Sequence, residues 1–254
     1  MYKRQGSDWS VLTAFNKAGY EVVNQNFLAE RKAYAAANGG QEDIYDVAEV
    51  NIAAAQSDTA VFVISRTSAE NADRKAEKGD YYLSDRELQN IRFMTENYSN
   101  CVVLLNTGGV IDLTELRKIS GVQAILLTGQ TGNMGGHAVA DVLMAKTVPS
   151  GKLTDTWARS YDDYPSSRTF SYRDDNLDDE YYSDGIYVGY RYFDTFGIMP
   201  LYCFGYGKGY TDFSLVTKEV TADEKLVKVE VEVTNIGKVY PGCLLYTSPS
   251  PRDC

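Results

Sequence analysis

The sequence predicts an α/β fold: a three-layer α/β sandwich with a mainly parallel sheet, followed by an incomplete antiparallel β segment. The sandwich is predicted because, up to about residue 145, apolar runs suited to buried strands alternate with helical patterns. The antiparallel segment is predicted because apolar and polar side chains alternate over residues 214–240 with the period of two typical of half-buried strands.

The chain before the first core strand is predicted to be mainly helical. Residues 8–18 fit an amphipathic helix, with Asp8 as its N-cap and Gly19 as its stop. The elements expected next are a short strand at 20–23, helices at 27–37 and 44–56, and a strand at 60–65. The apolar residues of the helix at 44–56 include Ile44, Val47 and Ile52. Because no strand precedes residues 8–18, we expect the first strand of the sandwich to be missing from this chain.

A polar loop of about twenty residues follows the strand at 60–65. It ends where Ser84 and Glu87 form the capping box of a helix at 84–98. The charged residues of the loop are Glu70, Asp73, Arg74, Lys75, Lys78 and Asp80. Long loops at the carboxyl ends of core strands are where α/β proteins place their chemistry, so this loop is the candidate site. The alternative is a solvated loop whose charges pair with each other.

The remaining elements continue the strand and helix alternation. They are a strand at 102–106, a short helix at 112–118, a strand at 122–127 and a glycine-led helix at about 135–145. Cys101 opens an apolar strand and is expected to be a buried thiol. Glycines 129, 132, 135 and 136 precede a helix, but no GK[S/T] or GxGxxG follows, so tight turns are favoured over a phosphate cradle.

Composition excludes several classes of function. The 254 residues carry a formal net charge of −10, which argues against nucleic-acid binding. No apolar run approaches the roughly twenty residues that span a bilayer, and the start has no apolar signal-peptide core. The four cysteines form no CxxC pair and His137 is the only histidine, so we expect no metal site, no disulfide framework and no cofactor.

The long loop closely resembles the acid/base loop of glycoside hydrolase family 3 β-glucosidases. The resemblance lies in an Ile-Ser-Arg strand end followed by Ser-x-Glu, Asp-Arg-Lys and Lys-Gly-Asp. It continues, in order, through GQTGNMGG at 129–136, PSGKLTDTW at 149–157 and the stretch DGIYVGYRYFDTFG that begins at Asp184. It implies that Glu70 is the general acid/base. For Arg66 and the other charged loop residues, two roles are open: bracing the loop by ion pairs or touching sugar hydroxyls. We favour bracing, because exposed ion pairs are common and individually weak.

The resemblance also implies a domain organisation. Residues 6–160 correspond to the α/β-sandwich domain, residues 161–212 to a Tyr- and Gly-rich connector, and residues 213–242 to a truncated fibronectin type III-like domain. The connector is expected to be a structural wrap, with an aromatic sugar platform as the alternative. The nucleophile is expected in a missing (β/α)8 barrel domain of the same parent chain. Residues 151–167 and 185–197 resemble the subgroup whose barrel follows the fibronectin-like module.

Ser7-Asp8-Trp9 mimics the tripeptide that carries the family's nucleophilic aspartate, but it opens a helix here, so we interpret Asp8 as an N-cap. The implied substrate is a β-glucoside or a short β-linked oligosaccharide, and the fragment alone is expected to be inactive. A β-xylosidase or other β-glycosidase of the family, and a non-catalytic α/β sugar-binding module, remain as alternatives.

Both ends of the chain look foreign to the domain. Residues 1–5 and 243–254 resemble translated sequencing-adapter sequence, and SPSPRDC has two prolines and no periodicity. We expect both ends to be unstructured.

Overall fold

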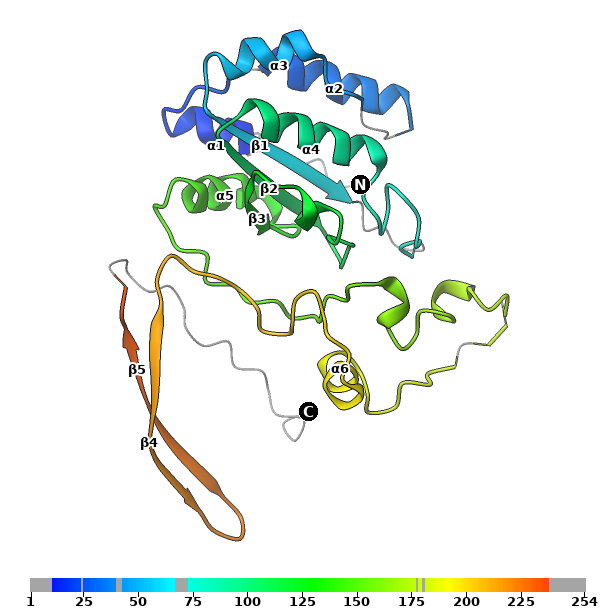
Figure 1. Cartoon of the computed structure of the whole chain (residues 1–254), viewed down its shortest axis with the longest axis vertical. Helices are drawn as coiled ribbons and strands as arrows, with labels where there is room; N and C mark the ends of the chain where they lie inside the picture. The colour runs from blue at the N-terminus through cyan, green and yellow to red at the C-terminus, as the bar shows by residue number, and fades with distance from the viewer. Residues whose placement is uncertain are drawn as a thin grey trace. The chain divides into compact units, whose positions relative to one another are not determined.

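The computed structural model describes residues 11–23, 25–39, 43–66, 73–176, 178–179 and 181–237 (Figure 1). The described chain forms two compact units. Residues up to Ala140, together with Asp155–Cys203, form the first, and Asp141–Thr154 with the residues from Phe204 onward form the second. Outside the described residues lie Asp8, Glu70 and the two ends predicted to be foreign, 1–5 and 243–254. The domain boundaries at residues 160 and 212 stay predictions.

A three-stranded parallel sheet forms the centre of the first unit, as predicted. Its strands are β1 (Thr59–Arg66), β2 (Asn100–Thr107) and β3 (Val122–Leu127), in the order β1-β2-β3. On one face of the sheet, β1 and β2 bury a row of mostly apolar neighbours in register, the pairs Ala60–Cys101, Phe62–Val103, Ile64–Leu105 and Arg66–Thr107. The predicted burial of Cys101 is confirmed, and burial raises the pKa of its thiol.

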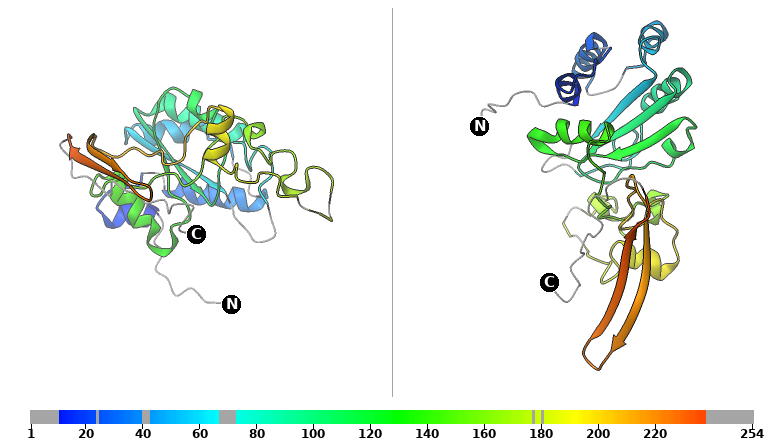
Figure 2. Two further views of the ribbon diagram at one scale, coloured as in Figure 1. Left: turned by 90° about the horizontal axis from the view of Figure 1, so that it is seen from below. Right: turned by 90° about the vertical axis from the view of Figure 1, so that its left-hand side faces the viewer.

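Helices cover the sheet. The helix α4 (Asp85–Asn97) packs on β1 and β2 and buries Leu88, Ile91 and Met94. It begins at the predicted capping box, in which Ser84 accepts from the Glu87 backbone N–H and Glu87 accepts from the Ser84 N–H. In Figure 2, α4 lies on one side of the sheet, and α1 (Val11–Lys17) and α5 (Gly135–Leu143) lie on the other, which makes the three predicted layers.

The chain between α1 and β1 differs in part from the prediction. The helix α2 (Gln25–Ala37) is present, and Gly19, at φ +87°, ends the turn after α1 as expected. The predicted strand at 20–23 is wrong, because no described strand pairs with those residues. A strand is held by ladder hydrogen bonds to a neighbouring strand, so a short segment with two valines does not form one by itself.

The predicted helix at 44–56 is shorter in the structure, and a different face of it is buried. The helix α3 (Val47–Ala54) begins only after Asp46, whose carboxylate accepts from the Ala48 and Glu49 backbone N–H groups. The apolar residues predicted to mark its face are exposed: Ile44 by 46%, Val47 by 58% and Ile52 by 64%. Val50 and Ala53 are buried instead. Packing against α4 sets this rotation, which a weakly periodic sequence leaves open.

Two further helices are shorter than predicted. Only Leu116–Lys118 of the segment 112–118 is helical, as the 3-10 turn η1, because the Asp112 carboxylate holds the Thr114 N–H and hydroxyl in a local turn. The helix α5 ends at Leu143, and Ala145 takes a left-handed conformation at φ +54°.

The Tyr- and Gly-rich segment carries little regular structure. Among its described residues, the regular elements are two 3-10 turns, η3 (Tyr161–Asp163) and η4 (Phe170–Tyr172), and the helix α6 (Tyr190–Phe196). Buried Trp157, just before the segment, pairs with Tyr202 near its far end. The Trp157 N–H donates to the Tyr202 carbonyl, and the Tyr202 N–H donates to the Trp157 carbonyl. The chain therefore leaves Trp157 and returns to it about forty-five residues later, so this stretch forms a long loop whose two ends are hydrogen-bonded together.

The second unit contains an antiparallel hairpin, as predicted. The strands β4 (Phe213–Ala222) and β5 (Val227–Asn235) are joined by a turn in which Asp223 accepts from the Lys225 and Leu226 N–H groups. One face of β5 carries the half-exposed residues Val227, Val229, Val231 and Val233. The other carries Lys228, Glu230 and Glu232, and Glu232 pairs with Lys218. The predicted antiparallel strands are confirmed. The expectation that they are half-buried is wrong for this unit, because the residues of β5 from Val227 to Thr234 are all exposed.

Candidate functional site

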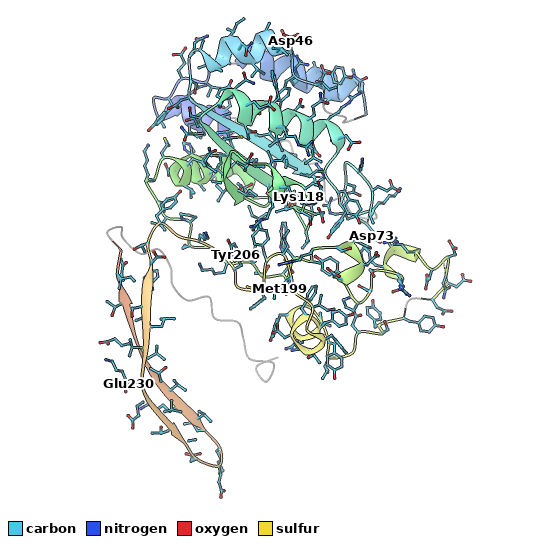
Figure 3. All side chains as sticks on the ribbon, in the orientation of Figure 1. Asp46, Asp73, Lys118, Met199, Tyr206 and Glu230 are labelled. Atoms are coloured by element: carbon cyan, nitrogen blue, oxygen red, sulfur yellow. The ribbon has the colours of Figure 1, made fainter. Side chains whose placement is uncertain are left out.

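The carboxyl ends of the three parallel strands meet at one edge of the sheet. Arg66 ends β1, Thr107 ends β2 and Leu127 ends β3. The predicted acid/base loop leaves the sheet at this edge, directly after Arg66. Glu70 itself lies outside the described residues, and the described part of the loop begins at Asp73, which Figure 3 labels.

A buried ion pair joins the start of the loop to α4. The two terminal nitrogens of Arg66 donate to the two carboxylate oxygens of Glu87, at 2.7 and 2.8 Å. The two residues are only 8% and 6% exposed. Two parallel, charge-assisted hydrogen bonds satisfy both groups away from water, which a buried charge pair requires. Glu87 thus caps the helix and holds Arg66 with the same carboxylate.

The end of the loop is tied to its start through Asp80. The Asp80 carbonyl accepts from Arg66 Nε at 2.8 Å. Its carboxylate accepts from Arg74 Nη1 at 2.5 Å and from the Lys75 backbone N–H at 2.6 Å. A turn through Gly79, at φ +89°, brings Asp80 back to this position.

The favoured bracing role is therefore confirmed for most of the charged loop residues. Arg66, Arg74 and Asp80 pair as described above, and Lys78 pairs with Asp85 at 2.7 Å on the exposed side. Lys75 contributes its backbone N–H, while the Asp73 side chain is exposed to solvent. Sequence patterns did not reveal Glu87 as the partner of Arg66, because the capping box already explained a glutamate there.

Tyr81 and Asp112 lie next to the end of the charged loop. The sequence analysis assigned no functional role to either residue. Tyr81 is buried, and its carbonyl accepts from the Asp112 N–H at 2.8 Å, which connects the loop after β1 to the segment after β2. Burial raises the pKa of Asp112, although its hydrogen bonds from Thr114 oppose the change. Burial also raises the pKa of Tyr81, with a smaller contribution from Tyr164.

The glycine-rich loop after β3 forms tight turns, as favoured. Gly129 and Gly132 have φ values of +60° and +70°. A Cβ at Gly135 would lie 1.8 Å from the Thr131 hydroxyl oxygen, so the turn has no room for a side chain. In the part of the chain that the structure describes, His137 does not belong to any group of three or more potential metal ligands. Within the same residues, no helix is both long and apolar enough to cross a membrane.

The parallel sheet covered by helices on both sides, with a long charged loop after a core strand, makes the first unit an α/β-sandwich domain whose candidate site lies at the carboxyl ends of its strands. The family model described as the glycosyl hydrolase family 3 C-terminal domain matches residues 8–190. The chain therefore belongs to glycosyl hydrolase family 3, in its C-terminal domain.

Relatives with known names support this assignment. The chain is 37% identical over 244 residues to beta-glucosidase A of Butyrivibrio fibrisolvens and 39% identical over 189 residues to a beta-glucosidase of Ruminococcus albus. These alignments cover 79% and 74% of this chain but only 29% and 19% of the relatives. The chain thus spans less than a third of the length of either.

Solved structures share the fold. Beta-glucosidase 3B from Thermotoga neapolitana, in complex with glycerol, matches with a TM-score of 0.82 and 34% identity over 93% of this chain and 35% of that protein. A beta-glucosidase from Paenibacillus barengoltzii matches with a TM-score of 0.78 and 30% identity, over 94% of this chain and 29% of that protein. The α/β-sandwich prediction is confirmed at the level of the family fold.

Proposed function

We propose that this chain is the acid/base-bearing part of a retaining β-glucosidase, with Glu70 as the general acid/base. The observation that carries the proposal is the membership in glycosyl hydrolase family 3, joined to a Ser-x-Glu whose glutamate, Glu70, lies four residues after the end of β1. The names of the relatives support glucose as the sugar, as does a structure of the Thermotoga enzyme in complex with glucose.

Retention requires a second carboxylate about 5–5.5 Å from the first. In the proposed reaction, the nucleophilic carboxylate attacks the anomeric carbon while the Glu70 carboxyl gives its proton to the departing glycosidic oxygen. Water then attacks the anomeric carbon of the glycosyl-enzyme, the Glu70 carboxylate takes a proton from that water, and the bond to the nucleophile breaks.

We place the nucleophile in a (β/α)8 barrel domain of the parent protein, because Asp8 is interpreted as a helix cap. The 254-residue chain alone is accordingly proposed to be inactive. It should release no nitrophenol from aryl β-glucosides above the blank rate. Activity in this chain that disappears in Asp8→Asn would contradict the placement of the nucleophile.

The role of Glu70 is tested in the full-length parent enzyme with Glu70→Gln. Loss of the acid should slow cleavage by about 10²–10⁴-fold for cellobiose and least for aryl glucosides with good leaving groups, which need little protonation. Azide should restore turnover of those activated substrates, because it replaces the water that needs a base. Near-normal activity of Glu70→Gln on cellobiose would rule out the assignment. Faster cleavage of aryl β-xylosides than of aryl β-glucosides would instead identify a β-xylosidase.

A further inference from the structure

The Thr114 hydroxyl lies between two oxygens that can both accept its proton. Thr114 Oγ1 is 3.1 Å from Oδ2 of Asp112 and 2.9 Å from the backbone carbonyl oxygen of Arg159. A hydroxyl carries a single proton, so it can donate fully to only one of these two oxygens. The oxygen that receives the proton therefore depends on whether Asp112 is protonated or ionised.

The two states of Asp112 give different hydrogen-bond patterns. A protonated Asp112 can donate from Oδ2 to Thr114 Oγ1, and the Thr114 proton is then free to bind the Arg159 carbonyl. An ionised Asp112 only accepts, and a hydrogen bond to a carboxylate is roughly twice as strong as one to a neutral carbonyl. The Thr114 proton then turns to Asp112, and the Arg159 carbonyl loses this donor. In both states Asp112 Oδ1 can accept from the Thr114 N–H, which lies at 2.9 Å.

Arg159 lies where the Tyr- and Gly-rich segment leaves the α/β layers and returns to them. It follows Trp157, which is paired with Tyr202. The Nε of Arg159 also donates to the Pro200 carbonyl at 3.2 Å, so this one residue contacts both ends of the segment. Thr114 belongs to the loop that follows β2. The hydrogen bond from Thr114 to Arg159 therefore connects the base of the segment to the carboxyl edge of the sheet.

The surroundings of Asp112 favour the protonated form. Asp112 is only 7% exposed, and its burial raises the pKa of its carboxyl group. The ionisable groups that face it are Tyr81 and Tyr82 from the loop after β1, Tyr164 from the Tyr- and Gly-rich segment, and Glu115 and Lys118 from its own loop. Glu115 raises the pKa of Asp112 and Lys118 lowers it, and these two residues pair with each other at 2.6 Å. Among the described residues, Asp112 takes part in no ion pair, so no cation holds it in the ionised form.

We propose that Asp112, Thr114 and Arg159 form a pH-sensitive latch, which fastens the base of the Tyr- and Gly-rich segment when Asp112 is protonated and releases it when Asp112 is ionised. We call these three residues the proton latch. The edge-to-face contact between Tyr81 and Tyr161 does not depend on the Asp112 proton, so an open latch loosens the base without detaching the segment. The inference is independent of the proposed glycosidase function.

Hydrogen exchange on the 254-residue chain tests the latch. The amides to follow are those of Trp157 and Leu201, which donate to the Tyr202 and Trp157 carbonyls at the base of the segment. Protection factors, corrected for the change of intrinsic exchange with pH, are measured from about pH 4 to pH 8. In the wild-type chain they should fall about two- to tenfold as the pH rises through the folded pKa of Asp112, because one hydrogen bond at the base is lost. The amides of β2 are the internal reference and should not follow this change.

Two substitutions hold the latch in opposite states. Asp112→Asn cannot ionise, and its NH2 group can donate to Thr114 Oγ1 while its oxygen accepts from the Thr114 N–H, so protection should stay at the low-pH value throughout. Thr114→Val removes the hydroxyl, so protection should stay at the high-pH value throughout. Thr114→Ser is the matched control, because it keeps the hydroxyl and should keep the pH dependence of the wild type.

Wild-type protection that does not change with pH would overturn the inference. The same pH dependence in Thr114→Val as in the wild type would also overturn it, because another carboxyl group would then be responsible. Asp163 is one such group, since it accepts from the Ser160 N–H at 3.0 Å. Protonation of Asp163 would weaken that contact and lower protection at low pH, which is the opposite sign. If Asp112→Asn does not fold, the comparison of Thr114→Val with Thr114→Ser still decides, because neither substitution changes a charge.

Discussion

Tyr81 and Tyr161 pack edge to face, with their ring centroids 5.0 Å apart and their planes at 76°. Tyr81 lies at the end of the charged loop, and Tyr161 opens the Tyr- and Gly-rich segment. Tyr161 also contacts Tyr164, and the Arg173 guanidinium lies over its ring at 4.8 Å. The segment is thus docked on the α/β layers by aromatic contacts right beside the candidate site.

Removal of the Tyr161 ring should therefore loosen this docking. We expect Tyr161→Ala to lower the free energy of unfolding by about 2–3 kcal/mol, since it loses both the aromatic pairs and the cation–π contact. Tyr161→Phe is the control and should stay within about 0.5 kcal/mol, because it keeps the ring. Urea unfolding followed by fluorescence measures both. Equal losses in the two variants would mean that the hydroxyl, not the ring, makes the important contact.

The buried and exposed ion pairs of the loop should differ sharply in their effect on stability. Glu87→Ala leaves the Arg66 charge buried without its partner, so we expect a loss of about 3–5 kcal/mol in the free energy of unfolding. Lys78→Ala breaks the exposed pair with Asp85 and should cost less than about 1 kcal/mol. Chemical denaturation at low and high salt distinguishes them, since salt should reduce only the smaller effect. A similar loss in both variants would contradict the burial argument.

Gly121 should not tolerate a side chain. Its φ is +98°, and a Cβ there would lie 2.8 Å from the Thr95 Cβ on α4. Gly121→Ala should therefore cost about 2–5 kcal/mol through backbone strain and overpacking together. Gly39→Ala is the matched control, because Gly39 has a φ of +66° with open space around it and should lose only about 1–2 kcal/mol. Thermal unfolding of both variants checks the difference, and equal shifts would show that the contact with Thr95 relaxes freely.

Asp112 should make stability fall as the pH rises. Burial raises its pKa in the folded protein, so the folded state keeps the proton at pH values where the unfolded state has lost it. The stability contributed at low pH is therefore lost as the pH rises from the ordinary aspartate range through the folded pKa. Asp112→Asn keeps an oxygen to accept from Thr114 but cannot ionise. Its stability relative to wild type should increase over this interval and stay constant above it, in denaturation measured from about pH 3 to pH 8. A difference that does not change with pH would contradict the buried-charge argument.

Strong local patterns predicted much of the fold. The apolar runs at 60–65, 102–106 and 122–127 became the three strands, and Ser84 with Glu87 fixed the start of α4. The period-two alternation after Leu226 became β5. The capping box is satisfied within a few residues. The strands are recognisable from their own apolar patterns, although their hydrogen bonds go to neighbouring strands.

The charged loop shows where prediction from the sequence stopped. Its residue types and its place after a core strand indicated a site, and the resemblance gave Glu70 its proposed role. The sequence did not pair Arg66 with Glu87, twenty-one residues away, or bring Asp80 back to Arg66. Such pairings depend on the path of the loop in space, and short sequence patterns do not determine that path.

The sequence by itself determined the strand and helix order, the start of α4 and the family, because apolar runs, a capping box and an ordered string of motifs can all be recognised along the chain. Only the tertiary structure decided that Ile44, Val47 and Ile52 face solvent, that residues 20–23 form no strand, and that one arginine holds both ends of the charged loop. Each of those outcomes depends on which surfaces meet in space. Burying apolar side chains and pairing charges stabilise the protein only where two surfaces meet. Which side chains are buried or paired is therefore decided when the layers pack.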